Sequence, residues 1–232
     1  MKQRVLIIGA NSDIAQSCSE RYSARGCEVI WAAHKLADLP ASENEKILVD
    51  LRDSELSLAA LRGVECDIVV YCAGKLSTNE TALNTASGKE VRAVNYGTPV
   101  ALLGMFAEQF IKRKKGVIVG ISSVAADRGK ASNLVYGSAK AGFDHFLGGL
   151  RQYAHPHGVR VLTIRPGYVR TKMTSGMSLP KSLTASKEQV ADQIVKYSLS
   201  GFRNIVYVKS VWRPLMWVLK HIPERVFKRK SL

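Results

Sequence analysis

The chain has 232 residues, of which 46% are hydrophobic and 23% charged, so it can bury the core of one ordinary domain and is not disordered. The apolar run near its start, Val5 to Ile8, is too short for a signal peptide, and no run of about 18 uncharged apolar residues offers a membrane span. Neither metal-ligand nor disulfide-framework spacing relates the four cysteines, Cys18, Cys27, Cys66 and Cys72. We therefore expect a cytoplasmic protein with no metal site.

Short β-branched runs alternate with longer stretches of helical periodicity along the chain. The predicted strands are Arg4–Ile8, Glu28–Ala32, Lys46–Val49, Asp67–Tyr71, Gly116–Ile121, Val159–Ile164 and Asn204–Val208. The helical stretches include Ile14–Ser23, Ser54–Leu61, Val91–Phe110 and Tyr136–Tyr153. This alternation predicts an α/β fold, a single-domain, doubly wound parallel sheet of about seven strands with helices on both faces. The aperiodic segment Thr171–Ser186 is long enough to be a functional loop such as a lid.

Small, polar and turn-forming residues follow most of the predicted strands. Ligands of doubly wound sheets bind outside the carboxyl ends of the strands, so these are the residues expected to form a site. In chain order they are Gly9 to Ala15, Asp50 to Arg52, Cys72 to Gly74, Ser122 with Ser123, and Arg165 to Thr171. Their recurrence at one edge of the sheet is stronger evidence for a site than any single motif.

The first of these loops resembles that of the short-chain dehydrogenase/reductase family, and the resemblance extends over about residues 4 to 210. The family's Gly-x-x-x-Gly-x-Gly pattern has Gly9, Asp13 and Ala15 at its glycine positions here. Gly9 allows the tight turn, and Ala15 is small enough for the helix to pack close to the strand. Asp13 is a departure, because its carboxylate is favoured at a helix start but must point away from the phosphates. The resemblance implies a Rossmann-type fold and NAD(P)(H)-dependent interconversion of a ketone and a secondary alcohol.

The family's Tyr-x-x-x-Lys motif occurs three times, as Tyr71/Lys75, Tyr136/Lys140 and Tyr168/Lys172. Only Tyr136 and Lys140 open a long helical stretch, where positions four apart share a face. Ser123 lies thirteen residues upstream of Tyr136 at a strand end, and "AVNYG" supplies Asn95, the family's fourth catalytic position.

The resemblance implies a role for each of these four residues. Tyr136 exchanges a proton with the substrate oxygen, and Ser123 holds that oxygen by a hydrogen bond. Lys140 lowers the pKa of Tyr136, together with the oxidised nicotinamide, and binds the nicotinamide ribose. Asn95 holds a water that links the lysine to solvent.

The resemblance also implies the cofactor contacts: Gly9, Asn11, Ser12, Asp13, Ile14, His34, Lys35, Asp50, Leu51, Cys72, Ala73, Gly74, Tyr136, Lys140, Pro166, Gly167, Val169 and Thr171. His34 and Lys35 stand where NAD-specific relatives place an acidic residue, and a cationic pair suits a 2′-phosphate. NADP(H) is therefore the preferred cofactor, with NAD(H) as the alternative. Asp50 is interpreted either as an adenine contact or as a turn residue, and Cys72 as a packing residue.

The net charge of +15 is concentrated toward the end of the chain, where residues 203–232 carry eight Lys or Arg against Glu224 alone. We divide the chain into a catalytic domain, residues 1–210, and a basic amphipathic extension, residues 211–232. On a helix, one face of the extension within an arc of about 120° holds Val211, Trp212, Leu215, Val218, Leu219 and Ile222.

Lys209, Arg213 and Lys220 lie on the opposite side of that helix, and a second basic segment follows Pro223. Two interpretations stay open. Either the apolar face packs on the domain or on another subunit, or residues 211–230 lie flat on an anionic membrane.

Two classes of function remain, an active oxidoreductase and a catalytically silent dinucleotide-binding scaffold that acts through the tail. The complete set of four candidate catalytic residues favours the enzyme. A nucleic-acid partner is not expected, because the tail lacks the interleaved aromatic residues that bind single strands. The loop "GANSDIA" and the tail "HIPERVFKRK" resemble a bacterial branch of the family acting on keto-sugars carried by polyprenyl phosphate, in cell-envelope polysaccharide synthesis. A small-molecule carbonyl substrate is the broader expectation, and we expect a homo-oligomer.

Overall fold

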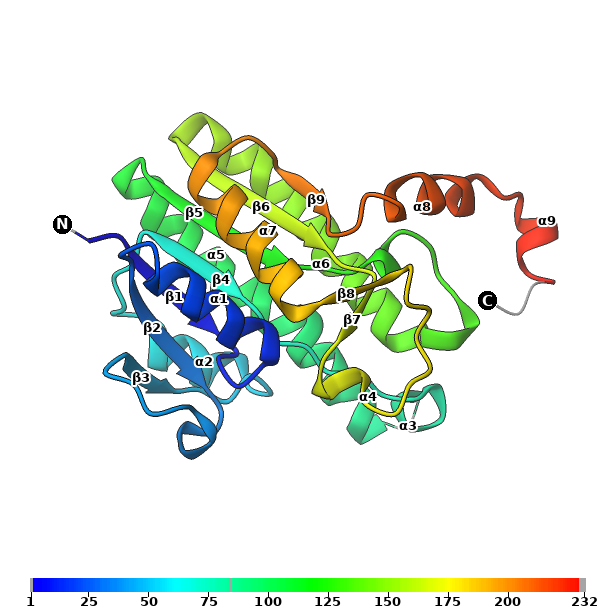
Figure 1. Cartoon of the computed structure of the whole chain (residues 1–232), viewed down its shortest axis with the longest axis horizontal. Helices are drawn as coiled ribbons and strands as arrows, with labels where there is room; N and C mark the ends of the chain where they lie inside the picture. The colour runs from blue at the N-terminus through cyan, green and yellow to red at the C-terminus, as the bar shows by residue number, and fades with distance from the viewer. Residues whose placement is uncertain (1, 84, 230–232) are drawn as a thin grey trace.

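The computed structural model describes residues 2–83 and 85–229 of the chain. Within these residues the main sheet has seven strands, all parallel, in the order β3-β2-β1-β4-β5-β6-β9 (Figure 1). Their bounds are β1 Arg4–Ile8, β2 Glu28–Ala33, β3 Glu45–Leu48, β4 Ile68–Tyr71, β5 Gly116–Ile121, β6 Val159–Arg165 and β9 Ile205–Tyr207. The predicted doubly wound sheet is confirmed, and the strand order reverses between β1 and β4.

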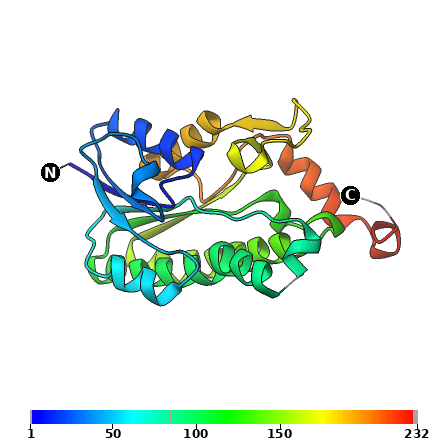
Figure 2. The same ribbon diagram turned by 90° about the horizontal axis from the view of Figure 1, so that it is seen from below.

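Helices cover both faces of this sheet (Figure 2). One face carries α1 (Asp13–Ser23) and α7 (Lys187–Ser200), which pack on each other. The other face carries α2 (Ser54–Leu61), α5 (Thr98–Arg113) and α6 (Leu134–Ala154). The short helices α3 (Asn79–Leu83) and α4 (Thr85–Arg92) pack against α6. Short 3-10 turns span Leu36–Asp38, Val124–Ala126, Ala131–Asn133, His155–His157 and Lys172–Thr174.

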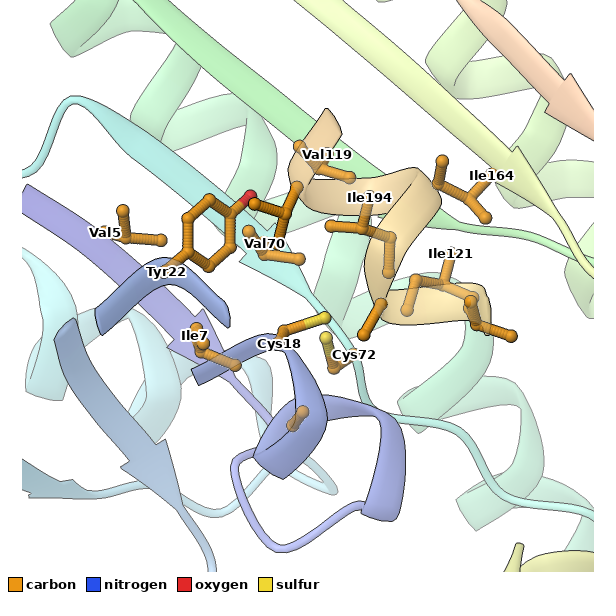
Figure 3. Packing of buried hydrophobic residues seen from close by; sticks show 14 of the residues in the cluster. Val5, Ile7, Cys18, Tyr22, Val70, Cys72, Val119, Ile121, Ile164 and Ile194 are labelled. Carbon is orange, nitrogen blue, oxygen red and sulfur yellow. The ribbon is translucent and has the colours of Figure 1, made fainter. Parts of the chain in front are cut away.

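The core under α1 and α7 follows from the sequence pattern of the buried strands. Strands such as β4 and β5 are apolar at successive positions because both of their faces are covered. Figure 3 shows Tyr22 of α1 and Ile194 of α7 lying over the side chains of these strands. The Tyr22 hydroxyl is satisfied in this apolar layer by the Ser198 hydroxyl at 2.7 Å, which fixes α1 against α7.

Two segments differ from the sequence predictions. The single helix expected over Val91–Phe110 is divided, because a π-helical turn at Ala93–Gly97 separates α4 from α5. The expected lid, Thr171–Ser186, is not wholly irregular. Its last residues form β8 (Thr184–Ser186), which pairs in parallel with β7 (Tyr168–Arg170). Strand pairing of this kind joins residues distant in the sequence, and periodicity within a short window does not report it.

The extension forms α8 (Trp212–His221) and α9 (Glu224–Phe227), which lie beyond the carboxyl ends of the strands (Figure 1). Its predicted apolar face is divided between protein and solvent. Trp212 is buried against Val124, together with Met216, which was not part of the predicted face, whereas Val211 and Val218 are 44% and 53% exposed.

Two of the three basic side chains predicted opposite the apolar face, Lys220 of α8 and Lys209 just before it, contact the domain. Lys220 Nζ lies 3.3 Å from the buried carboxylate of Asp127, and Lys209 Nζ donates to the Ser182 carbonyl at 2.8 Å. In the described part of the chain, no helix is long and apolar enough to cross a membrane.

Candidate active site

A cavity of about 1180 Å³ opens where β1, β4, β5 and β6 end. Every predicted cofactor-contacting residue lines it: Gly9, Asn11, Ser12, Asp13, Ile14, His34, Lys35, Asp50, Leu51, Cys72, Ala73, Gly74, Tyr136, Lys140, Pro166, Gly167, Val169 and Thr171. Ser123 also lines the cavity, together with Tyr136 and Lys140, whereas Asn95 lies behind its wall with no exposed surface. The carboxyl ends of the strands and the start of α6 therefore bring residues from six separate segments of the chain to one cavity.

The loop after β1 retains the geometry of a phosphate-binding turn despite its single glycine. Gly9 has φ +88°, and a Cβ there would lie 2.7 Å from the backbone nitrogen of Ala73. Both facts require glycine at this position. Ser12 caps α1 by accepting a hydrogen bond from the Ala15 amide at 3.1 Å. The Asn11 side chain donates to the Lys35 carbonyl at 2.8 Å, which ties this loop to the end of β2.

Asp13 is engaged by the lid rather than left free in the loop. Its Oδ2 accepts a hydrogen bond from the backbone amide of Lys172 at 2.6 Å. A residue at a degenerate glycine position thus connects the first turn of α1 to the segment after β7. The position of Asp13 at the start of α1 is also favourable, because the helix dipole stabilises a carboxylate there.

Lys140 and Tyr136 face the cavity from the first turns of α6. Lys140 Nζ donates to the Ile121 carbonyl at 2.9 Å and lies 5.9 Å from the centroid of the Tyr136 ring. Burial lowers the pKa of Lys140 to about 8. Burial raises the pKa of Tyr136, and a hydrogen bond with the Ser123 side chain opposes that rise.

The expected lowering of the Tyr136 pKa by Lys140 together with oxidised nicotinamide stays a prediction, and in this structure burial decides the direction of the shift. Desolvation of the phenol outweighs the favourable contacts, and its pKa lies above the ordinary value of 10.0. Ser123 is placed by its position before the 3-10 turn Val124–Ala126, where its Oγ accepts from the Ala125 amide at 3.1 Å.

Asn95 lies in the π-helical turn, a distortion that frequently occurs at functional sites. Its Nδ2 donates to the carbonyls of Lys75 and Val91 at 2.7 and 2.8 Å. Its Oδ1 accepts from the Lys75 amide at 3.3 Å. A Cβ on Gly74 would lie 3.4 Å from Asn95 Oδ1 and 3.9 Å from Lys140 Nζ. Asn95 thus holds the strand end after β4 directly behind Lys140.

The two competing Tyr-x-x-x-Lys pairs are placed differently. Tyr71 is fully buried in the core and donates to the Val94 carbonyl at 2.7 Å, while Lys75 pairs with Glu90 at 3.3 Å. Tyr168 lies on β7 and makes an edge contact with the ring of Trp212. Of the three tyrosines, Tyr136 is the one that stands beside a buried lysine and whose pKa is influenced by Ser123.

The end of the cavity near β2 and β3 is basic. His34, Lys35 and Arg52 line it, and Arg52 was not among the predicted contacts. The Arg52 guanidinium donates hydrogen bonds to both oxygens of the Asp50 carboxylate, at 2.8 and 2.7 Å. This pairing holds the pKa of Asp50 at about 2. The Asp50 carboxylate also accepts from the Arg52 amide, so it acts as a turn residue while lining the cavity.

Other lining residues escaped the sequence analysis. Lys130, Ser132 and Asn133 lie in the loop after β5 and line the cavity. The expectation that residues after a strand form the site would have included them, had it been extended past Ser123. Trp212 was assigned only to the apolar face of the extension, and no local signal places it in the cavity. A Cβ on Gly167 would lie 2.0 Å from the Trp212 ring, so the tryptophan packs directly on that backbone.

Comparison with known proteins identifies the family. A family model described as short chain dehydrogenase matches residues 3–181. The chain belongs to this family. An uncharacterized oxidoreductase of Mycobacterium tuberculosis is 32% identical over 97% of this chain and 96% of its own. Serine 3-dehydrogenase of Rhizobium radiobacter is 31% identical over 75% of each chain.

Solved structures of short-chain dehydrogenases share the fold. One from Burkholderia cenocepacia, in complex with NADP, has a TM-score of 0.83 at 20% identity and covers 98% of this chain and 97% of its own. Another from Sphingobium yanoikuyae, in complex with NADPH, has a TM-score of 0.81 at 22% identity over 96% and 97%. As a short-chain dehydrogenase, the protein is an NAD(P)-dependent oxidoreductase.

Proposed function

We propose that this short-chain dehydrogenase interconverts a ketone and a secondary alcohol, with Tyr136 as the general acid and base. One observation carries the proposal. Tyr136 lines a large cavity together with Ser123 and the buried Lys140, and the Ser123 hydroxyl is near enough to act on the pKa of Tyr136. A catalytically silent scaffold would not need this arrangement of proton donor, hydrogen-bond donor and buried cation.

Tyr136 can act as the proton donor in ketone reduction. Its phenol holds its proton at neutral pH and can give it to a developing alkoxide. Ser123 donates a hydrogen bond to the same oxygen and orients the carbonyl. The Lys140 ammonium lies near enough to stabilise negative charge that forms on the tyrosine oxygen in the reverse direction. Asn95 keeps the strand end after β4 in place behind the lysine.

The described residues fit a dinucleotide. The cradle at Gly9 has no room for a Cβ, and the start of α1 offers backbone amides to a phosphate. Bound NADPH supplies the hydride. We propose that the cofactor is preferentially NADP(H), held at its 2′-phosphate by His34, Lys35 and the nearby Arg52. The NADP and NADPH complexes of the two similar short-chain dehydrogenases support this preference.

Replacing Tyr136 with Phe tests the proposed function. We expect turnover of any accepted ketone with NADPH to fall by at least about 10³-fold, because the transferable proton is lost. NADPH affinity should stay within a few fold, since only one hydroxyl is removed. Tyr71→Phe is the matched control for the competing pair. Wild-type turnover by Tyr136→Phe, or a greater loss in Tyr71→Phe, would show that the wrong tyrosine has been chosen.

We propose more narrowly that the substrate is a keto-sugar on polyprenyl phosphate, used in cell-envelope polysaccharide synthesis. On this proposal, residues 1–210 catalyse and residues 211–232 hold the enzyme on the inner face of an anionic membrane. The exposed apolar side chains Val211, Trp217 and Val218 of α8 support it, since they lack cover from the domain. Turnover of a lipid-linked keto-sugar in preference to simple ketones is the expected result of a substrate screen.

A further inference from the structure

One of the partly buried lysines that line the cavity has no role in the proposed chemistry. This residue, Lys130, lies in the loop that connects β5 to α6. Its ammonium has no hydrogen-bond or ion-pair partner among residues 2–83 and 85–229. By contrast, Lys75 in the same cavity is paired with Glu90, and Arg52 with Asp50. Loss of hydration lowers the pKa of Lys130, with no carboxylate near enough to offset it.

The loop that carries Lys130 is anchored on both sides. Before it, the Arg128 guanidinium donates to the carbonyls of Leu219 and Ile222, each at 2.6 Å, and stacks on Phe227. After it, Asn79 donates to the Ala131 carbonyl and accepts from the Leu134 amide at 2.9 Å. The lysine is therefore presented by a backbone held in place rather than by a free surface loop.

A second unpaired group lies three residues further along. The Oδ1 atom of Asn133 is buried and has no hydrogen-bond partner in the described part of the chain. Buried polar atoms without a partner are rare, because nothing replaces their lost hydration. Asn133 begins α6, and Tyr136 lies one helical turn beyond it. The unpaired cation, the unpaired amide and the candidate acid thus come from one short segment that faces one cavity.

We propose that Lys130 binds an anionic group, a carboxylate or a phosphate, that the substrate carries near its ketone. This inference rests on the proposed function and names the substrate class. Tyr168, Met173 and Trp212 line the same cavity with large apolar surfaces, and these receive the uncharged body of the substrate.

Two matched pairs of ketones test the proposal. Phenacyl phosphate is compared with 2-hydroxyacetophenone, and benzoylformate with its methyl ester, each with NADPH. We expect the wild-type enzyme to prefer the anion in at least one pair, and that pair identifies the anion. In Lys130→Met, kcat/KM for the preferred anion should fall by about 10–100-fold, chiefly through KM, while the neutral ketone changes less than about twofold. Lys130→Arg should retain most of the preference. Lys115→Met, which changes an exposed lysine before β5, should behave as wild type.

A binding measurement decides the proposal independently of turnover. Phenyl phosphate and benzoate are titrated into the NADPH complex of each variant, with nicotinamide fluorescence as the readout. Weaker binding of an anion by Lys130→Met than by Lys115→Met supports the site. Equal binding, or equal losses for anionic and neutral ketones, overturns it. If no ketone is reduced at all, the proposed function fails, and the titration alone still decides whether Lys130 binds anions.

Discussion

Lys140 combines two properties that oppose each other in a folded protein. It is 3% exposed, yet its ammonium must be available to the tyrosine and to a ribose. The Ile121 carbonyl compensates part of the lost hydration by accepting a hydrogen bond at 2.9 Å. The residue is therefore a source of instability retained at a candidate site, and its titration should be visible in the stability of the whole protein.

The first residue-scale prediction is a pH-dependent stability difference between wild type and Lys140→Met. Burial lowers the pKa of Lys140 from 10.5 to about 8. Below pH 8 the amine is protonated in both states, so the full cost of the buried charge is present. Between these pKa values the folded chain releases the proton first, the unfolded chain holds more protons, and stability rises with pH. Over this pH range the free energy of unfolding of wild type should rise, relative to that of the variant, by on the order of 3 kcal/mol, at about 1.4 kcal/mol per pKa unit.

Denaturant unfolding of both proteins at closely spaced pH values measures this difference. The interval from pH 6 to 7 serves as the internal control, because both states hold the proton there and the difference should be flat. If the difference in free energy of unfolding stays constant up to pH 10.5, or if the variant gains stability relative to wild type as the pH rises, Lys140 does not carry a buried charge.

The second residue-scale prediction concerns the coenzyme. His34→Ala/Lys35→Ala removes two exposed cations from the basic end of the cavity. The ratio of kcat/KM with NADPH to that with NADH should fall by about 10–100-fold, as expected for lost hydrogen bonds to a charged group. Lys46→Ala removes a nearby cation that contacts the Trp31 ring, and it should leave the ratio unchanged. An unaltered ratio in the double variant would mean that these residues do not read the 2′-phosphate.

At the scale of elements, α8 is built into the site rather than appended to it. Asp127, whose side chain is 1% exposed, binds Arg165 of β6 at 3.4 Å, the Tyr207 hydroxyl of β9 at 2.9 Å and Lys220 of α8 at 3.3 Å. One carboxylate thus joins two strands to the extension. Because Asp127 follows Ser123 by only one 3-10 turn, movement of α8 and order in the catalytic wall are expected to be linked.

The element-scale prediction compares two tryptophans of the same helix. Trp212 is 5% exposed, packs on Gly167 and donates to the Leu183 carbonyl at 3.1 Å, whereas Trp217 is 64% exposed. Trp212→Ala should lower the free energy of unfolding by about 3–5 kcal/mol and raise the KM of the ketone, because it empties part of the cavity wall. Trp217→Ala should change stability by less than about 0.5 kcal/mol. Equal effects in urea unfolding would show that α8 does not dock as described.

At the scale of the whole molecule, the net charge is +15, and the docked extension leaves apolar and basic side chains exposed on its outer side. Trp217, Val218 and Val226 are exposed there, and the basic residues Arg225, Lys228 and Arg229 are exposed on the segment around α9. The buried half of α8 already packs on protein, so a membrane could be contacted only by the outer half. Each Lys or Arg close to an anionic surface contributes about 1 kcal/mol.

The whole-molecule prediction is that the protein co-sediments with vesicles containing phosphatidylserine at low salt and is released by high salt. Trp217→Ala/Val218→Ser should weaken that binding several fold without unfolding the protein. Phe202→Ser is the matched control, because Phe202 is 88% exposed and precedes the start of β9, whereas α8 follows the end of that strand. Failure of the full-length protein to bind at low salt would leave packing on protein as the only role of the extension.

The sequence by itself determined the class of fold, the positions of the seven main strands and the edge where the site lies. These features are local, because burial on both faces of a strand or on one side of a helix imposes a period within a few residues. The choice of Tyr136 among three Tyr-x-x-x-Lys pairs was also local, since it depended on a helix start and on a strand end thirteen residues earlier. The catalytic roles of the four residues still await the tests described above.

Only the tertiary structure decided which distant groups meet. Asp13 bonds the Lys172 amide across 159 positions of the chain, and Trp212 forms part of the wall at Gly167. It also showed that Lys130 lines the cavity without a partner in the described part of the chain, and that burial raises the pKa of Tyr136. The hydration and the partners of a group depend on all the helices, strands and loops that pack around it. The residues adjacent to it in the sequence form only some of these.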